Sequence, residues 1–116
     1  HHCTVTDMAV ILRAAMENDL CREVLSAHTY ETAPTPQHPE GQVLSNWFLR
    51  KIEDHDTEQT VRAVGAKTGY VAQSGSCAAS WGEDSSGNAY ICVTADAGSS
   101  WQAIYDHAAL YKTYCP

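Results

Sequence analysis

The chain has 116 residues, of which 44% are hydrophobic, so it can bury one modest core and has no room for a second domain. Its formal charge of -7, without a cluster of Lys and Arg, argues against a nucleic-acid or anionic-membrane partner. The chain opens on His1-His2-Cys3 rather than on a charged leader, and no apolar run approaches the roughly 18 residues of a membrane span. We therefore expect a mature or excised piece. We predict no metal site at its start, because correctly spaced partner ligands are missing.

Apolar residues at helical spacing predict a first helix from about Val5 to Glu17. Thr4 can cap it and form a capping-box-like pair with Asp7; Thr6 is the other candidate cap. The predicted core face consists of Met8, Ile11, Leu12, Ala15 and Met16.

A second, short helix is predicted from Leu20 to Ala27, with Asp19 as its cap. It should bury Leu20, Val24 and Leu25, with Cys21 packed as a small hydrophobe.

The middle of the chain is predicted to be mostly loop. Three prolines between His28 and Glu40 exclude a helix and favour an extended surface loop, with a brief strand near residues 29–32. Ser45 can cap a short helix from Asn46 to Ile52. The acidic run at residues 53–58 is interpreted as a solvated loop rather than a metal site, because adjacent side chains point in different directions.

The C-terminal half changes to the period of a strand. Three strands are predicted, at Val61 to Ala72, Ser76 to Trp81 and Ala89 to Ala95, joined by turns that suit antiparallel hairpins. A last helix, capped by Ser99 or Ser100, should lie across this sheet. Its predicted core face consists of Trp101, Ile104, Tyr105, Ala108 and Tyr111, with His107 on the surface.

Together these elements predict an α+β fold. A three-stranded antiparallel meander carries a packed C-terminal helix, preceded by helices and a Pro-rich loop. Residues 1–58 would form the end of a helical part and residues 59–116 the sheet part of a single-domain fragment.

The first predicted strand carries the candidate binding residues Lys67, Thr68 and Gly69. A cation, a hydroxyl and a glycine that exposes the backbone are suited to anion recognition. In an extended segment Lys67 and Gly69 face one side and Thr68 the other, so the main chain must belong to any site. Three such residues alone fit a solvated edge strand better, and the context has to decide.

That context is a resemblance to a known family. Lys67-Thr68-Gly69-Tyr70, followed by Ser74-Gly75-Ser76-Cys77 and an apolar strand, resembles the third motif of serine D-alanyl-D-alanine carboxypeptidases of the penicillin-binding class. Order and spacing agree over nearly the whole chain. Other segments that resemble the family are Thr6-Asp7-Met8-Ala9, Tyr30-Glu31-Thr32 and Leu44-Ser45-Asn46.

The chain departs from the family pattern at three places. Val71 stands where Thr is usual, and Ala78-Ala79 replace a bulkier pair. The first two family motifs belong upstream of His1, so the chain resembles only the C-terminal half of a catalytic domain with a β-lactamase/transpeptidase-like fold.

The sequence contains no Ser-x-x-Lys and no Gly-x-Ser-x-Gly nucleophile motif. Ser86-Gly87-Asn88 matches Ser-x-Asn, but it follows Lys67 and lies in a predicted hairpin turn, where turn chemistry explains it. The sequence therefore predicts a substrate-binding wall without its nucleophile.

The resemblance implies a hydrolase that removes the terminal D-alanine from peptidoglycan stem peptides through a serine acyl-enzyme and is acylated by penicillins. In that scheme Lys67 and Thr68 bind the substrate carboxylate, the strand from Gly69 to Val71 pairs with the peptide, and the Tyr70 N–H is an oxyanion donor. It further implies an extracytoplasmic location, no cofactor, and the N-terminal half of the domain as a second chain or swapped copy.

Two alternatives stay open. A serine β-lactamase or esterase shares the motif and the fold, although the continuation from Tyr70 to Cys77 favours the carboxypeptidase. A non-catalytic module would instead bind wall peptide or a protein partner through its strand edges.

Five cysteines without a Cys-x-x-Cys pair favour disulfides over a zinc or thioredoxin-type site, and the odd count leaves one thiol free or bonded to another chain. If Gly82 opposes Gly87 in the second hairpin, Cys77 lies opposite Cys92, within reach of a disulfide. The outer edge of the last strand, residues 90–94, should be covered by a partner strand.

Overall fold

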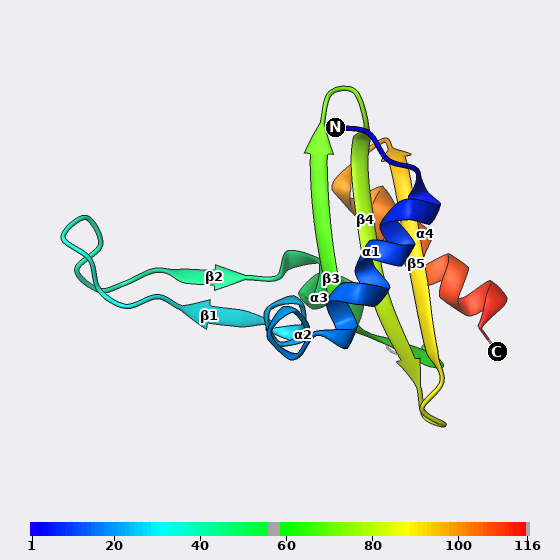
Figure 1. The fold of residues 1–116 in the computed structure, drawn as a ribbon, viewed down its shortest axis with the longest axis horizontal. Helices are drawn as coiled ribbons and strands as arrows, with labels where there is room; N and C mark the ends of the chain where they lie inside the picture. Colours follow the sequence, from blue (N-terminus) through cyan, green and yellow to red (C-terminus); the bar gives the residue numbers. More distant parts are fainter. Residues whose placement is uncertain (56–58, 116) are drawn as a thin grey trace.

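The computed structural model describes residues 1–55 and 59–115, and it confirms the predicted α+β fold (Figure 1). None of its described helices is long and apolar enough to cross a membrane. The elements in chain order are α1 (Val5–Glu17), α2 (Asp19–Ser26), β1 (Thr29–Glu31), β2 (Val43–Ser45), α3 (Trp47–His55), β3 (Val61–Val71), β4 (Gly75–Asp84), β5 (Ala89–Ala97) and α4 (Ser100–Tyr114).

The three long strands form an antiparallel sheet in the order β3-β4-β5, with helices on both of its faces (Figure 1). The neighbours Ala78 and Ala79 on β4 point to opposite faces, as successive strand residues must. Ala78 belongs to the core beneath α3 and α4, whereas Ala79 packs with Leu12 and Met16 of α1. These small side chains in the central strand let helices approach the sheet from both sides. The larger core beneath α3 and α4 includes Phe48, Leu49, Ile52, Ala103, Ile104 and Ala108.

Local capping fixes the starts of the first two helices. The predicted helix α1 is confirmed, and Thr4 and Asp7 form the full capping box, with Asp7 N donating to Thr4 Oγ1 at 3.0 Å and Thr4 N donating to Asp7 Oδ2 at 2.9 Å. Helix α2 is capped by Asn18 rather than Asp19, since Asn18 Oδ1 accepts from Cys21 N at 3.0 Å. The predicted burial of Ile11 is wrong, because this side chain is 55% exposed.

Helix α2 also turns a different face to the core than the sequence predicts. Leu20 and Val24 are 69% and 66% exposed, so their predicted burial is wrong. The helix is held through Leu25, which packs near Gly65, and through an ion pair of 2.8 Å between Arg22 and Glu83 of β4. These two contacts place Leu20 and Val24 on the solvent side.

The middle segment contains more regular structure than predicted. Strands β1 and β2 pair with Tyr30 opposite Leu44 and project from the body as a hairpin (Figure 1). Asn46, rather than Ser45, caps α3, because its Oδ1 accepts from Leu49 N at 3.2 Å. Helix α3 continues to His55, so the first half of the acidic run is helical instead of a loop. Residues 56–58 of that run lie outside the described residues.

The register of the second hairpin differs from the prediction. Gly82 lies opposite Tyr90 rather than Gly87, and Cys92 lies opposite Ser80. The turn closes later because Asp84 Oδ1 accepts from the N–H groups of residues 86 and 88 at 2.8 and 2.9 Å. Ser86-Gly87-Asn88 is thereby part of this turn, as predicted.

The predicted position of Cys77 depended on this register and is wrong as well. Cys77 pairs with Gly69 on β3 and not with Cys92. None of the five cysteines is disulfide-bonded in this structure, and Cys21 is exposed rather than packed.

Helix α4 begins after Ser99, whose Oγ accepts from Gln102 N at 3.0 Å. His107 is fully buried, so its predicted surface position is wrong. Its Nδ1 shares a hydrogen bond of 2.7 Å with Ser80 Oγ, and its Nε2 one of 3.0 Å with Thr94 Oγ1. The buried face of the helix is rotated from the predicted one and consists of Ala103, Ile104, His107, Ala108 and Tyr111, while Trp101 and Tyr105 stay 44% and 40% exposed.

The buried histidine makes stability depend on pH. Burial lowers the pKa of His107 from 6.5 to about 4, so the unfolded chain binds more protons than the native one between these values. Stability should be full above pH 6.5 and fall as the pH drops toward 4, by roughly 3 kcal/mol for a shift of this size. Urea unfolding at neutral and acidic pH measures this loss.

His107→Gln serves as the control, because the amide forms hydrogen bonds but does not titrate. This variant should be less stable at neutral pH and should lose the pH dependence between 6.5 and 4. An unchanged slope in the variant would assign the acid sensitivity to other groups.

Candidate functional site

The predicted binding residues lie on the C-terminal half of β3, an edge strand of the sheet. Within the described residues, β3 pairs along one side with β4 only. The side-chain amide of Asn46 covers its other side at Ala66, donating to the Ala66 carbonyl at 2.9 Å and to the Leu25 carbonyl at 3.2 Å. Beyond that point, residues 67–71 leave an open strand edge.

The direction of the backbone groups along this edge follows from the antiparallel pattern. In an antiparallel strand, the N–H and C=O groups of one residue point toward the neighbouring strand and those of the next residue point away from it. The Ala66 carbonyl points away from β4, to the outer side, where Asn46 donates to it. The Val71 carbonyl accepts from Ser74 N within the β3–β4 turn, on the inner side. The main-chain groups of Thr68 and Tyr70 are therefore expected to face the open edge, where they can pair with an extended ligand.

The side chains of this segment are little used by the fold. Thr68 is half-buried, Lys67 and Gly69 are exposed, and Tyr70 and Val71 are 70% and 55% exposed. Large apolar residues left exposed on an edge strand invite pairing with another chain or a ligand.

The Lys67 ammonium is placed at the open edge as well. Its Nζ donates to the Thr68 carbonyl, which faces that edge. Within residues 1–55 and 59–115, no carboxylate forms an ion pair with it. The charge is thus available to an anionic ligand at the same edge as the Thr68 carbonyl.

Sequence reasoning missed a second polar cluster, the buried contact between Ser80 and His107. Its geometry resembles a nucleophile and its base, but both residues are fully buried and Tyr111 OH also bonds Ser80 Oγ at 2.7 Å. A substrate cannot reach it, so the cluster is structural. In the part of the chain that the structure describes, no group of three or more His, Cys, Asp or Glu side chains is placed to hold a metal ion.

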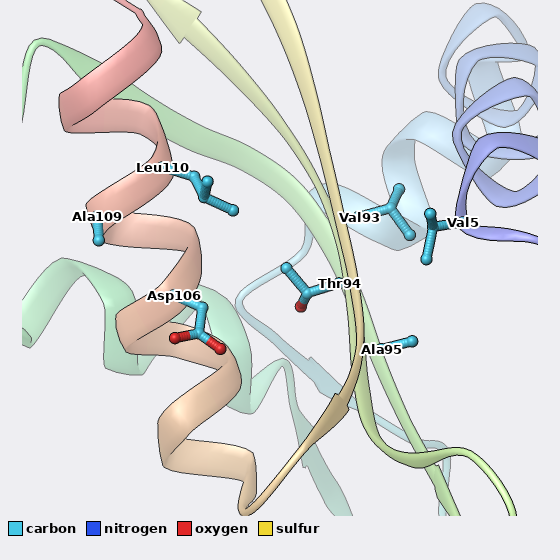
Figure 2. A pocket seen from close by; sticks show the side chains of 7 residues that line it. All are labelled: Val5, Val93, Thr94, Ala95, Asp106, Ala109 and Leu110. Carbon is cyan, nitrogen blue, oxygen red and sulfur yellow. The ribbon is translucent and has the colours of Figure 1, made fainter.

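A groove of about 470 Å³ runs beside β5, on the opposite edge of the sheet from Lys67 (Figure 2). Val5 of α1 borders it on one face and Leu110 of α4 on the other, 46% and 36% exposed. Figure 2 shows Val93 and Ala95 directed toward the α1 side and Thr94 toward α4. A backbone edge between two apolar borders has the shape needed by an added strand. The full lining consists of Val5, Val93, Thr94, Ala95, Asp106, Ala109 and Leu110.

Comparison with protein-family models and with curated proteins finds no match for this chain. Among solved structures, it is similar to the D-alanyl-D-alanine carboxypeptidase from Mycobacterium tuberculosis, with a TM-score of 0.59 and 17% sequence identity. The match covers 87% of this chain and 38% of the other, so the chain spans well under half the length of that enzyme. At this identity the likeness shows the fold: an α+β arrangement shared with part of a carboxypeptidase.

Gly69 should be dispensable for folding. A Cβ built on Gly69 meets nothing within 4 Å, whereas one on Gly82 would lie 2.5 Å from Val61 Cγ1. Gly69→Ala should therefore change the free energy of unfolding by less than about 0.5 kcal/mol. Gly82→Ala, the matched control on the neighbouring strand, should cost about 1–3 kcal/mol by overpacking.

Urea unfolding of both variants measures the difference. A loss at Gly69 as large as that at Gly82 would mean that Gly69 is needed for packing rather than for ligand approach.

Proposed function

We propose that this chain is the C-terminal part of a serine D-alanyl-D-alanine carboxypeptidase of the penicillin-binding class. The observation that carries the proposal is Lys67-Thr68-Gly69-Tyr70 on the open edge of β3, in a fold shared with part of such an enzyme. The ligand it fits is an extended peptide that ends in a carboxylate, because a strand edge supplies backbone pairing and Lys67 supplies the charge.

In the proposed reaction, a serine outside this chain attacks the carbonyl of the penultimate D-alanine of a peptidoglycan stem peptide. The terminal D-alanine leaves, and water then hydrolyses the ester. Lys67 and Thr68 bind the terminal carboxylate, and the strand from Gly69 to Val71 pairs with the peptide. The Tyr70 N–H, on the open edge, donates to the oxyanion as charge develops. Penicillins enter as acylating mimics of the dipeptide.

The proposed catalytic domain includes an N-terminal half, and we propose that this half pairs with β5. An N-terminal half, as a second chain or a swapped copy, would add a strand along residues 90–94, in the groove between Val5 and Leu110. Peptidoglycan as substrate places the assembled enzyme outside the cytoplasm, in the cell envelope or secreted.

Labelled penicillin tests the function directly. The assembled protein is incubated with the reagent and each chain is weighed intact. A covalent adduct on a serine of the companion segment supports the carboxypeptidase. The absence of any adduct, with all segments present and folded, supports the non-catalytic module.

Lys67→Ala should slow acylation by penicillin in the assembled enzyme. Loss of a charged hydrogen-bond partner costs roughly 1.5–3 kcal/mol, which is about one to two decades in the second-order rate constant. Stability should barely change, because Lys67 is exposed. Lys112→Ala, at an exposed lysine of α4, is the matched control and should leave the rate unchanged.

Two further variants measure how much Thr68 and Val71 contribute to acylation. Thr68→Val should cost less, about 0.5–1.5 kcal/mol for a neutral hydrogen bond, and Val71→Thr should be tolerated or mildly beneficial. Equal acylation rates for wild type and Lys67→Ala at matched thermal stability would show that β3 is not part of the substrate site.

The β5 pairing predicts a specific loss of association. Leu110→Asp places a charge at the apolar border of the groove, so the companion segment should bind at least about tenfold more weakly, a cost of about 1.4 kcal/mol. Leu20→Asp, at an equally apolar but more exposed position on α2, should have no effect. Sedimentation velocity measures binding, and hydrogen exchange should show residues 90–94 protected on assembly. Unprotected amides there would place the partner elsewhere.

A further inference from the structure

Two of the five free cysteines come together at the C-terminal end of α4. Cys92 on β5 and Cys115, the C-cap of α4, are each only 8% exposed. They belong to one cluster of contacting buried side chains, which Val61 and Tyr111 complete. The remaining thiols do not belong to this cluster. Cys3 and Cys21 are exposed, and Cys77 lies on β4 opposite Gly69 of β3.

The strand register explains why these two meet. Cys92 lies directly opposite Ser80, so both side chains point to the same face of the sheet. Ser80 is bonded to Tyr111 OH, one turn before the end of α4, which places the next turn of the helix over Cys92. The Cys115 carbonyl also accepts from Thr60 Oγ1 at 3.2 Å, which ties this end of the chain to the start of β3.

We propose that Cys92 and Cys115 form a disulfide that fastens the end of α4 to the sheet. The bond closes a loop containing all of α4, and closure of such a loop stabilises the folded state. This inference concerns the fold and does not depend on the proposed enzymatic function.

The chemistry requires an oxidant, for which a small disulfide such as oxidised glutathione suffices. The Cys115 thiolate attacks the reagent, forms a mixed disulfide and releases one reduced thiol. The Cys92 thiolate then attacks the mixed disulfide and releases the second. The protein loses two protons and two electrons, and the reagent's S–S bond takes up both.

Burial controls when the bond forms. It raises the pKa of Cys92 to about 12, and the neighbouring Cys115 adds to the shift. Burial also raises the pKa of Cys115. Both groups are thus protonated at neutral pH, and reaction begins when the last turn of α4, where Cys115 is the C-cap, opens locally and exposes the Cys115 thiol.

Peptide mapping of the full chain tests the bond. After oxidation with glutathione disulfide, alkylation and trypsin, cleavage at Lys67 and Lys112 leaves Cys115 in residues 113–116 and Cys92 in residues 68–112. We expect these peptides to be joined. Residues 68–112 also contain Cys77, so Cys77→Ser is the matched control and should keep the joined peptide, whereas Cys92→Ser should lose it.

Thermal unfolding gives a second measurement. Dithiothreitol should lower the Tm of the oxidised chain by about ten degrees, from the loop-closure estimate, and leave that of Cys115→Ser unchanged. Peptides 68–112 and 113–116 that stay separate in oxidised Cys77→Ser would overturn the proposal, even if Cys92→Ser failed to fold. A joined peptide that persists in Cys92→Ser would overturn it as well.

Discussion

The buried hydrogen bonds around His107 hold the sheet and its C-terminal helix in one register. His107 bonds Ser80 of β4 on one ring nitrogen and Thr94 of β5 on the other, and Tyr111 bonds both the hydroxyl and the carbonyl of Ser80, the latter at 3.1 Å. An imidazole with both nitrogens bonded adds no unpaired polar group to the core. Sliding α4 by one residue would leave several of these groups unpaired at once, which costs about 1–3 kcal/mol for each.

Fixing α4 in this way decides what happens at the two edges of the sheet. On the β5 side, α4 brings Leu110 to the border of the groove and the end of the helix over Cys92. On the β3 side, α3 packs against α4, and its cap residue Asn46 closes the lower part of the edge at Ala66. What stays open is the segment from Lys67 to Val71. The same packing that builds the core therefore sets the length of the open edge.

Local patterns were enough to predict most of the elements. The capping box at Thr4, the helical period of α1 and the change to strand period after residue 60 are short-range features, and each is confirmed. The placement of Lys67, Thr68 and Gly69 on an edge strand followed from the same patterns; their roles in binding remain a prediction. Sequence reasoning failed where distant residues decide. His107 is polar, and only its partners on β4 and β5 make its burial acceptable. The register of β4 on β5 depended on which residue closes the turn, and Asp84 closes it later than turn length alone suggested.

The segment from Lys67 to Val71 differs from the rest of β3 in what the fold requires of it. The first half of the strand is fixed by packing: Val61, Ala63 and Ala66 are buried, and a Cβ on Gly65 would lie 3.0 Å from Met16. The second half buries almost nothing, yet it combines a cation, a glycine in open space and large apolar side chains in water. Large apolar side chains that are exposed to water and add little to stability are expected at binding sites. Beyond Ala66, β3 is held by its pairing with β4 and hardly by side-chain packing, so the fold places little constraint on which side chains stand at the open edge.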